Sequence, residues 1–328
     1  MKAIVQDTYG SPETLSLRET PQPSPSAREV LVRVRAAAVN AYDWHMMRGD
    51  PWVMRLAHRS TREPRARIRG RDLAGIVESV DDEVTTLRPG DEVYGDTGEE
   101  DGAFAEYVCV AENKLAPKPG KLTFEQAAAV PLAGTTALVG LRDAGKLQSG
   151  QHVLINGASG GVGTFAVQIA KALGATVTAV CRTRNAELVA ELGADHVVDY
   201  TREDFTRGEA RHELVLDLVG NRSLAEFRRV LTPDGTLLLS GGGVSRGGTL
   251  FGPMALIVRG RLTSRFVKHR IGEFSGSSNR DLLTSLTEFI ESGQVEPVID
   301  RSYPLERTAE AIRYLETEHA RAKVVLTV

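Results

Sequence analysis

The sequence predicts an α/β protein in two parts: a mostly β domain, and a domain built on a doubly wound parallel sheet. Up to about residue 120 the chain shows strand-like alternation broken by turn signals. From residue 122 to 274 predicted helices and strands alternate, the pattern of a parallel sheet covered by helices. Within that second region, residues 153–175 combine a strand, a glycine-rich turn and a helix in immediate succession.

The first region is expected to form an irregular, mostly β domain over residues 1–121. Residues at alternate positions of 30–35 are valines, as in a strand with one face turned to the core. The segment RPGDEVYG at 88–95 has the composition of a turn between strands.

The last part of the chain is expected to complete the first domain. Apolar residues at helical spacing predict amphipathic helices over 280–291 and 305–316, followed by a closing strand over 323–328. We expect this strand to rejoin the first domain, so that residues 275–328 belong with residues 1–121.

The second region, residues 122–274, begins its sheet at the apolar run 153–155, which has no helical spacing and suits a buried parallel strand. From Val162 the apolar residues follow one helical face, and Gly174 is placed to end that helix. The later elements expected are strands over 176–181, 196–199, 214–219 and 236–240 and a helix over 186–192.

The glycine-rich turn predicts a site for the pyrophosphate of a dinucleotide. Gly157, Gly160, Gly161 and Gly163 leave backbone N–H groups uncovered at the positive end of the following helix. Their spacing is G-x-x-G-x-x-G, and the strand before and helix after supply the context that the motif requires. The alternative is a turn whose glycines only let the helix pack close to the sheet.

The end of the next strand favours NADP(H) over NAD(H). An acidic residue there would bind the ribose 2′-hydroxyl of NAD, and residues 181–185, CRTRN, contain none. Arg182 and Arg184 can instead grip a 2′-phosphate with paired hydrogen bonds. The alternative is two solvated arginines, with Asn185 capping the next helix.

Composition limits the class of protein and its partners. The 328 residues are 41% hydrophobic and 25% charged, with a formal net charge of −3, as in a soluble globular protein without a basic face for nucleic acid. No window has the length and apolarity of a membrane span, so we expect no membrane partner and a cytoplasmic location. Cys109 and Cys181 are too few for a disulfide framework or a cysteine-rich zinc site.

A series of motifs resembles the zinc-independent quinone oxidoreductase branch of the medium-chain dehydrogenase/reductase family. The motifs are AAAVNAYDWHMMRG (36–49), RGRDLAGIV (69–77), RPGDEVYG (88–95), AAAVPLAGTTA (127–137), GASGGVG (157–163), GADHVVDY (193–200) and ARAKVVL (320–326). The resemblance covers nearly the whole chain. It implies a GroES-like β domain interrupted by a Rossmann domain, in agreement with the organisation above.

The resemblance also implies roles for individual residues. Asn40, His45 and Thr135 would approach the nicotinamide end of the cofactor. Ser159, Gly160, Gly161 and Val162 would hold the pyrophosphate, and Arg182, Arg184 and Tyr200 would flank the adenosine and its 2′-phosphate. Val219, Gly220, Ser240, Gly241 and Gly242 would line the strand ends nearer the nicotinamide. Related quinone reductases often carry a tyrosine where this chain has His45, so the role of that side chain stays open.

The same comparison predicts that no metal takes part in catalysis. Zinc-using relatives place a cysteine where this chain has Asn40, and a His-Glu pair where it has Arg71 and Asp72. An amide and a guanidinium cannot replace a thiolate and an imidazole on zinc. Scattered carboxylates and one histidine in a β domain are usually salt-bridged surface groups, and we expect this of the remaining potential ligands, Asp43, His45, Asp72 and Glu106.

The predicted function is transfer of a hydride from NADPH to a quinone or an α,β-unsaturated carbonyl. Asn40, Tyr42 and His45 are the candidate catalytic residues, and Tyr42, His45 or water could return the proton. The alternatives are an NADP-dependent alcohol dehydrogenase, an enoyl thioester reductase, and an NADPH-binding sensor or structural protein. The apolar segment 250–266 could be a pocket wall, a dimer contact or plain core, and we expect a homodimer that acts on a small-molecule substrate.

Overall fold

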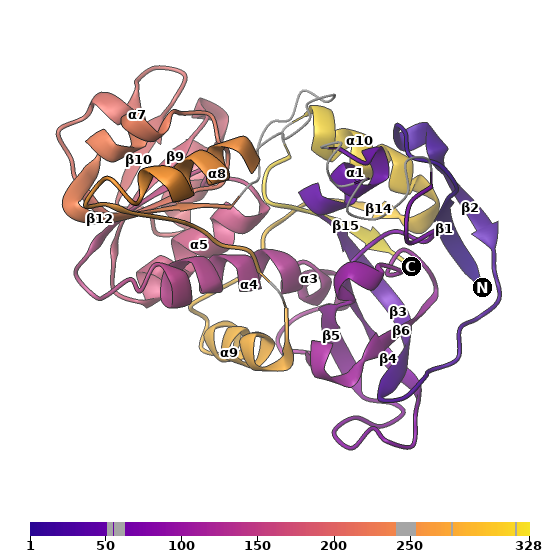
Figure 1. Ribbon diagram of the computed structural model, residues 1–328. Coiled ribbons are helices and arrows are strands. Elements are labelled where there is room, and N and C mark those ends of the chain that lie inside the picture. The colour runs from indigo at the N-terminus through magenta and orange to yellow at the C-terminus, as the bar shows by residue number, and fades with distance from the viewer. Residues whose placement is uncertain (51–54, 56–62, 241–253, 277, 319) are drawn as a thin grey trace. The chain divides into compact units, whose positions relative to one another are not determined.

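The computed structural model describes residues 1–50, 55, 63–240, 254–276, 278–318 and 320–328 (Figure 1). Contacts divide the chain into two compact units. The first unit comprises residues 1–135, 277–292 and 297–328, and the second comprises 136–276 and 293–296. The domains expected at 1–121 with 275–328 and at 122–274 stay a prediction, while the compact units group residues 122–135 with the first part of the chain.

The first unit is built mainly of β-strands, as expected. Its strands are β1 (Lys2–Gln6), β2 (Leu15–Glu19), β3 (Glu29–Val39), β4 (Asp72–Val80), β5 (Glu92–Asp96), β6 (Tyr107–Ala111), β7 (Leu115–Pro117), β14 (Ile299–Pro304) and β15 (Lys323–Thr327). Its helices are α1 (Ala41–Arg48), α3 (Phe124–Ala128), α9 (Arg280–Glu291) and α10 (Thr308–Thr317), and α4 (Pro131–Leu138) begins in this unit.

A seven-stranded sheet organises the first unit. Its order is β14-β15-β3-β4-β5-β7, with β6 also paired to β3, while β1 and β2 form a separate hairpin sheet. The closing strand β15 pairs antiparallel to β3, with Val324 opposite Val39, so the expectation that it rejoins the first domain is confirmed. The core lies between this sheet and helices such as α10, and the valines at 30, 32 and 34 are buried in it.

The second unit contains the predicted parallel sheet. Its strands are β8 (His152–Asn156), β9 (Thr176–Cys181), β10 (His196–Asp199), β11 (His212–Asp217), β12 (Leu231–Leu239) and β13 (Arg270–Glu273). Its helices are α5 (Gly161–Ala172), α6 (Ala186–Glu191), α7 (Leu224–Arg229) and α8 (Met254–Thr263), and a π-helical stretch (Val139–Ala144) follows α4.

The six strands run parallel in the order β10-β9-β8-β11-β12-β13. The order reverses at β8, since β9 and β10 lie on one side of it and β11 on the other. In such sheets, ligands bind beyond the carboxyl ends of the strands at this switch point. The turn after β8 is the glycine-rich turn 157–163.

Some predicted boundaries were wrong by two to five residues. The strand expected at 214–219 is β11, which ends at Asp217 because the carboxylate of that residue accepts hydrogen bonds from the N–H groups of Val219 and Gly220 and turns the chain. The strand expected at 236–240 begins at Leu231. The helix expected at 305–316 starts as a 3-10 turn (Leu305–Arg307) before α10.

Candidate functional site

The glycine-rich turn connects β8 to α5 in the second unit. Gly157 has a φ of +91°, a conformation that glycine adopts without strain. A Cβ at Gly163 would lie 2.2 Å from the carbonyl oxygen of Gly157, so only glycine lets α5 approach the turn so closely. Backbone conformation therefore explains Gly157, and close packing explains Gly163.

Gly160 has a different environment. It is the N-cap of α5, with an extended backbone, and a Cβ there would meet only the Gly157 carbonyl oxygen, at an ordinary 3.5 Å. Packing does not require glycine at this position. The first-turn N–H groups of a helix have no carbonyl partner inside the helix, so a small residue here keeps them open to an anion.

Asn185 is a residue of this region whose role the sequence analysis missed. It makes no side-chain cap on α6, contrary to the alternative considered above. Its Nδ2 donates to Ser159 Oγ at 2.9 Å, which ties the loop after β9 to the glycine-rich turn. The side chain is buried, and its Oδ1 has no hydrogen-bond partner. The only sequence signal was a short polar residue following the two arginines.

The loop after β9 carries Arg182 and Arg184, and both are exposed. Thr183 lies between them and donates to Asp199 Oδ2 at 2.5 Å. Hydrogen bonds from Thr183 and Thr201 lower the pKa of Asp199 to about 2, so this carboxylate is charged at neutral pH. An acid therefore does lie beside the arginine loop, but it comes from the end of β10 and not from β9. Neighbouring Tyr200 is 39% exposed.

The ends of β8 and β11 form a buried polar group. Asn156 Nδ2 donates to Asp217 Oδ1 at 2.8 Å, and the N–H of Ser240 donates to the Asp217 carbonyl oxygen at 3.0 Å. With its bonds to Val219 and Gly220, Asp217 organises three of the predicted strand-end residues. Burial raises the pKa of Asp217, while these N–H donors oppose the rise. The other two, at positions 241 and 242, lie outside the described residues.

In the first unit, Asn40 lies in a buried network with Asp72 and Lys323. Lys323 Nζ donates to Asn40 Oδ1 at 2.5 Å and to Asp72 Oδ2 at 3.2 Å. Asn40 Nδ2 donates to Asp72 Oδ2 at 3.0 Å and to the Ala38 carbonyl oxygen at 3.3 Å. The other oxygen of Asp72 accepts from the N–H of Leu132 at 2.9 Å. Burial raises the pKa of Asp72, and Lys323 opposes the rise.

Tyr42 lies beside a second charged pair. The guanidinium of Arg71 binds Asp96 through two hydrogen bonds, of 2.9 and 2.8 Å, and lies 4.6 Å from the centre of the Tyr42 ring. Tyr42 is half-buried. Burial, assisted by Asp101, raises the pKa of Tyr42 to about 12, although Arg71 opposes the rise. The phenol is therefore neutral and holds its proton at physiological pH.

His45 lies one turn further along α1, where its ring stacks on Trp44 at 3.6 Å. Its Nδ1 lies 3.1 Å from the carbonyl oxygen of Asp50. A carbonyl can only accept, so Nδ1 carries the hydrogen and a neutral ring leaves Nε2 without one. Burial lowers the pKa of His45, which favours this neutral form.

Two more carboxyl groups, Asp43 and Asp101, are buried in the first unit. Asp43 Oδ2 accepts from the N–H of Asn40 at 2.7 Å, while its Oδ1 has no hydrogen-bond partner. Burial, with help from the charge of Asp101, raises the pKa of Asp43 to about 8. Asp101 pairs with Arg69 at 3.2 Å. The expectation that Asp43 and Asp72 are surface groups is wrong, because they are 1% and 0% exposed.

Thr135 is fully buried at the end of the first unit. Its hydroxyl donates to the carbonyl oxygen of Pro131 at 2.6 Å, one turn earlier in α4. The four candidates Asn40, Tyr42, His45 and Thr135 thus share two helices of the first unit. The remaining candidates belong to the second unit.

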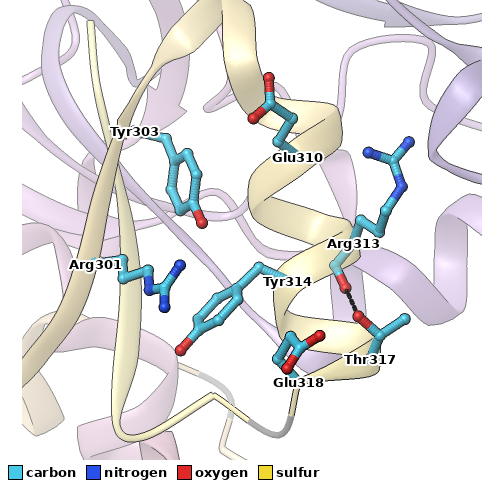
Figure 2. Close-up of a pocket in the computed structure, with 7 residues that line it drawn as sticks. All are labelled: Arg301, Tyr303, Glu310, Arg313, Tyr314, Thr317 and Glu318. Atoms are coloured by element: carbon cyan, nitrogen blue, oxygen red, sulfur yellow. Dashed lines mark hydrogen bonds between the residues drawn. The ribbon is translucent and has the colours of Figure 1, made fainter.

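A surface pocket of about 350 Å³ lies between β14 and α10 (Figure 2). Its polar groups already have partners within the first unit. Arg301 lies over the ring of Tyr314 at 4.1 Å, and Arg313 pairs with Glu13 at 2.5 Å. None of the site residues expected from sequence lines this pocket.

Known families match two parts of the chain. Residues 26–120 match the family described as alcohol dehydrogenase GroES-like domain, and residues 192–326 match the one described as zinc-binding dehydrogenase. The first match lies within the sheet-rich first unit, and the second runs from the parallel sheet of the second unit into the closing segments of the first.

Named relatives cover almost the whole chain. The chain is 36% identical over 338 residues to the 2-methylene-furan-3-one reductase of Solanum lycopersicum, covering 99% of this chain and 79% of the relative. It is 35% identical, with the same coverage, to the chloroplastic NADPH-dependent alkenal/one oxidoreductase of Arabidopsis thaliana. The solved quinone oxidoreductase of Coxiella burnetii matches with a TM-score of 0.89 at 30% identity, over 100% of this chain and 99% of that one. The chain therefore belongs to the medium-chain dehydrogenase/reductase family, in its quinone oxidoreductase branch.

Proposed function

We propose that this protein reduces a quinone or an α,β-unsaturated carbonyl with NADPH, and that it does so without catalytic zinc. As a member of its family it is an oxidoreductase that uses a nicotinamide cofactor and acts on a small molecule. One observation carries the finer proposal: Asn40, Arg71 and Asp72 are all engaged by other groups of the protein. A conjugated acceptor spreads the developing negative charge and can be reduced without a metal.

The three positions that correspond to zinc ligands in relatives do not suit zinc. The amide oxygen of Asn40 and the carboxylate of Asp72 both accept from the Lys323 ammonium. Arg71 is itself a cation, held by Asp96. A zinc ion prefers thiolate, imidazole and carboxylate ligands, and here it would have to displace one buried cation beside another. We expect chelators to leave turnover intact and elemental analysis to find no stoichiometric zinc.

The second unit suits a dinucleotide. Gly160 has no packing reason to be glycine, and the Oδ1 of Asn185 is buried without a partner close to Ser159. We propose that Ser159, Gly160, Gly161 and Val162 hold the pyrophosphate, that Arg182, Arg184 and Tyr200 hold the adenosine with its 2′-phosphate, and that Val219, Gly220 and Ser240 to Gly242 lie toward the nicotinamide. When bound, NADPH supplies the hydride.

Cofactor preference can be tested by titrating cofactor fluorescence. NADPH should bind more tightly than NADH, because two guanidiniums can bind the 2′-phosphate. Replacing Arg182 and Arg184 by alanine together should remove most of the preference without changing the affinity for NADH. Equal affinities for the two cofactors in the unmodified protein would reject the assignment.

For return of the proton, we propose Tyr42 rather than His45. The phenol of Tyr42 is neutral, with a pKa of about 12, and carries a hydrogen to donate. The neutral His45 ring gives its only N–H to Asp50 and offers a bare Nε2. His45 would therefore orient the acceptor or accept a hydrogen bond at Nε2. Asn40 would contribute by positioning the start of α1, of which it is the N-cap.

The decisive experiment measures NADPH oxidation across quinones, enones, aldehydes and alcohols. We expect turnover with a conjugated acceptor, and a loss of kcat of about 10²-fold in Tyr42→Phe with NADPH affinity unchanged. His45→Phe should lower kcat less than Tyr42→Phe does. Oxidation of primary alcohols with NADP, with no activity on any quinone or enone, would favour the alcohol dehydrogenase alternative. NADPH binding without any turnover would favour a sensor.

We also propose that the protein is a homodimer that uses the face of α8. Val258 and Leu262 are each 53% exposed and Phe266 is 86% exposed, at successive turns along and just beyond this helix. In the described part of the second unit, β13 is an edge strand beside α8. Of the segment 250–266, residues 250–253 lie outside the described residues. Light scattering should give a mass twice that of the chain for the wild type. The Phe266→Asp variant should have the mass of a single chain.

A cytoplasmic location also remains a proposal, which cell fractionation can test. No helix in the described ranges has both the length and the apolarity to cross a membrane.

A further inference from the structure

Lys323 joins segments that are far apart in the sequence. It lies at the start of β15, and its Nζ contacts Asn40, the N-cap of α1, and Asp72, the first residue of β4. Asp72 in turn accepts from the N–H of Leu132 in the first turn of α4. A single ammonium therefore connects β15, α1, β4 and α4 of the first unit.

These contacts engage both hydrogens of the Asn40 amide and one lone pair of its oxygen. Both of its hydrogens have acceptors, Asp72 and Ala38, and its oxygen accepts from Lys323. The amide is thus fixed in one orientation and has no free hydrogen for a substrate. The Asn40 backbone N–H donates to Asp43, which closes the capping box of α1.

The Lys323 and Asp72 side chains are 3% and 0% exposed. Replacing a buried ion pair by apolar residues of similar size is often neutral or stabilising, so stability alone is a poor reason for keeping such a pair. Lys323 binds the start of α1 through Asn40, and Asp72 binds the start of α4 through Leu132. The buried pair can therefore fix the positions of these two helices.

We propose that Lys323 is a positioning residue, which fixes the starts of α1 and α4 through Asn40 and Asp72 and so orients Tyr42, His45 and Thr135. The proposal rests on the proposed function, in which α1 carries the groups that act on the acceptor. Lys323 itself neither contacts the acceptor nor transfers a proton.

The test compares Lys323→Met with the double variant Lys323→Met/Asp72→Asn. The single variant leaves a buried carboxylate without its cation and is expected to lose stability. The double variant leaves no unpaired charge, and the amide oxygen that replaces the carboxylate can still accept from Leu132. Lys171→Met is the matched control, because Lys171 pairs with Asp195 at the surface of the second unit.

We expect the double variant to keep a melting temperature near that of the wild type and to bind NADPH within about twofold, since the residues proposed to hold the pyrophosphate and the adenosine belong to the second unit. Its kcat should fall about tenfold or more, as expected when reacting groups lose their alignment. Lys323→Arg should recover part of that loss. Lys171→Met should change neither kcat nor affinity.

Hydrogen exchange gives a readout that needs no turnover. Amides at the starts of α1 and α4 should exchange about tenfold faster in the double variant, while those of α5 keep their rates. Wild-type kcat or unchanged exchange in the folded double variant would overturn the proposal. A double variant that fails to fold would also reject it, because Lys323 would then be needed for folding. A wild type that reduces no acceptor would reject the proposed function, and hydrogen exchange would still judge the role of Lys323.

Discussion

The two units build their candidate sites in opposite ways. In the second unit the turn, the helix start and the strand beside it come from one continuous segment, residues 152–181. The groups proposed to bind the pyrophosphate there are largely backbone N–H groups. In the first unit, Asn40, Asp72, Leu132 and Lys323 come from four distant segments and meet through buried side chains. A site made of backbone N–H groups depends on residues without a side chain, such as glycine. A site made of side chains depends on the charged and polar groups that those side chains carry.

This difference predicts different mutational sensitivities. Adding one carbon at Gly163 should damage the second unit, because its Cβ has no room beside the Gly157 carbonyl oxygen. Removing one charge should damage the first unit, because a buried partner then loses its counter-ion. Substitutions in each unit therefore test whether the two sites differ in this way.

The largest effect is expected for Arg71→Met. Asp96, 1% exposed, would be left charged without its bidentate partner. Breaking a buried pair in this way costs about 3–5 kcal/mol in the free energy of unfolding. Urea denaturation of the apo-protein measures it. The double variant Arg71→Met/Asp96→Asn should recover most of the loss, and a single variant within about 1 kcal/mol of wild type would contradict the importance of buried charge here.

A matched pair of glycine substitutions tests the second unit. Gly163→Ala should cost about 1–3 kcal/mol in the free energy of unfolding, because its Cβ would lie 2.2 Å from the Gly157 carbonyl oxygen. Gly160→Ala should change stability by about 1 kcal/mol or less, since its Cβ meets only an ordinary contact. It should nevertheless raise the Kd for NADPH about tenfold, because it covers the start of α5. If Gly160→Ala binds normally, that glycine has no role in binding.

Asp43→Asn tests the pH dependence of the first unit. Burial raises the pKa of Asp43 to about 8 in the folded protein from its usual 3.8, so the folded state holds this proton while the unfolded state releases it. The contribution of Asp43 to the free energy of unfolding therefore falls as pH rises through this window, by about 1 kcal/mol per pH unit. The Asp43→Asn variant has no carboxyl group to titrate at this position. Its free energy of unfolding relative to that of the wild type should therefore rise from about pH 5 to about pH 8. A constant difference would show that Asp43 does not titrate in this range.

The smallest effect is expected for Asp199→Asn in the second unit. The charge of Asp199 lies beside Thr183, between the two arginines proposed to bind the 2′-phosphate. Its removal should raise the preference for NADPH over NADH only about two- to threefold, because both arginines are exposed and their charges are screened by water and salt. Asp195→Asn, at the opposite end of β10, is the control and should leave the preference unchanged.

Most elements of the second unit could be predicted from the sequence alone. The change from strand to helical periodicity around residues 153–175 predicted β8, the turn and α5, because each depends on local backbone preferences and on the small size of glycine. The same local signals set β9, β10 and α9 at or very near their observed limits. The end of β11 was misjudged, because the Asp217 carboxylate turns the chain through bonds that periodicity does not record.

Tertiary structure alone decided the arrangement of the first unit. Sequence singled out Asn40 as a candidate catalytic and cofactor-binding residue, and Arg71 and Asp72 by their positions at the zinc ligands of relatives. It offered no reason to connect any of them with Lys323 or Asp96. Those partners lie 283 positions from Asn40 and 25 from Arg71. Long-range pairs of this kind depend on sheet order and strand register, here β15 against β3 and β4 against β5. A lone lysine or aspartate in the sequence carries no sign of whether folding will bury it beside an opposite charge.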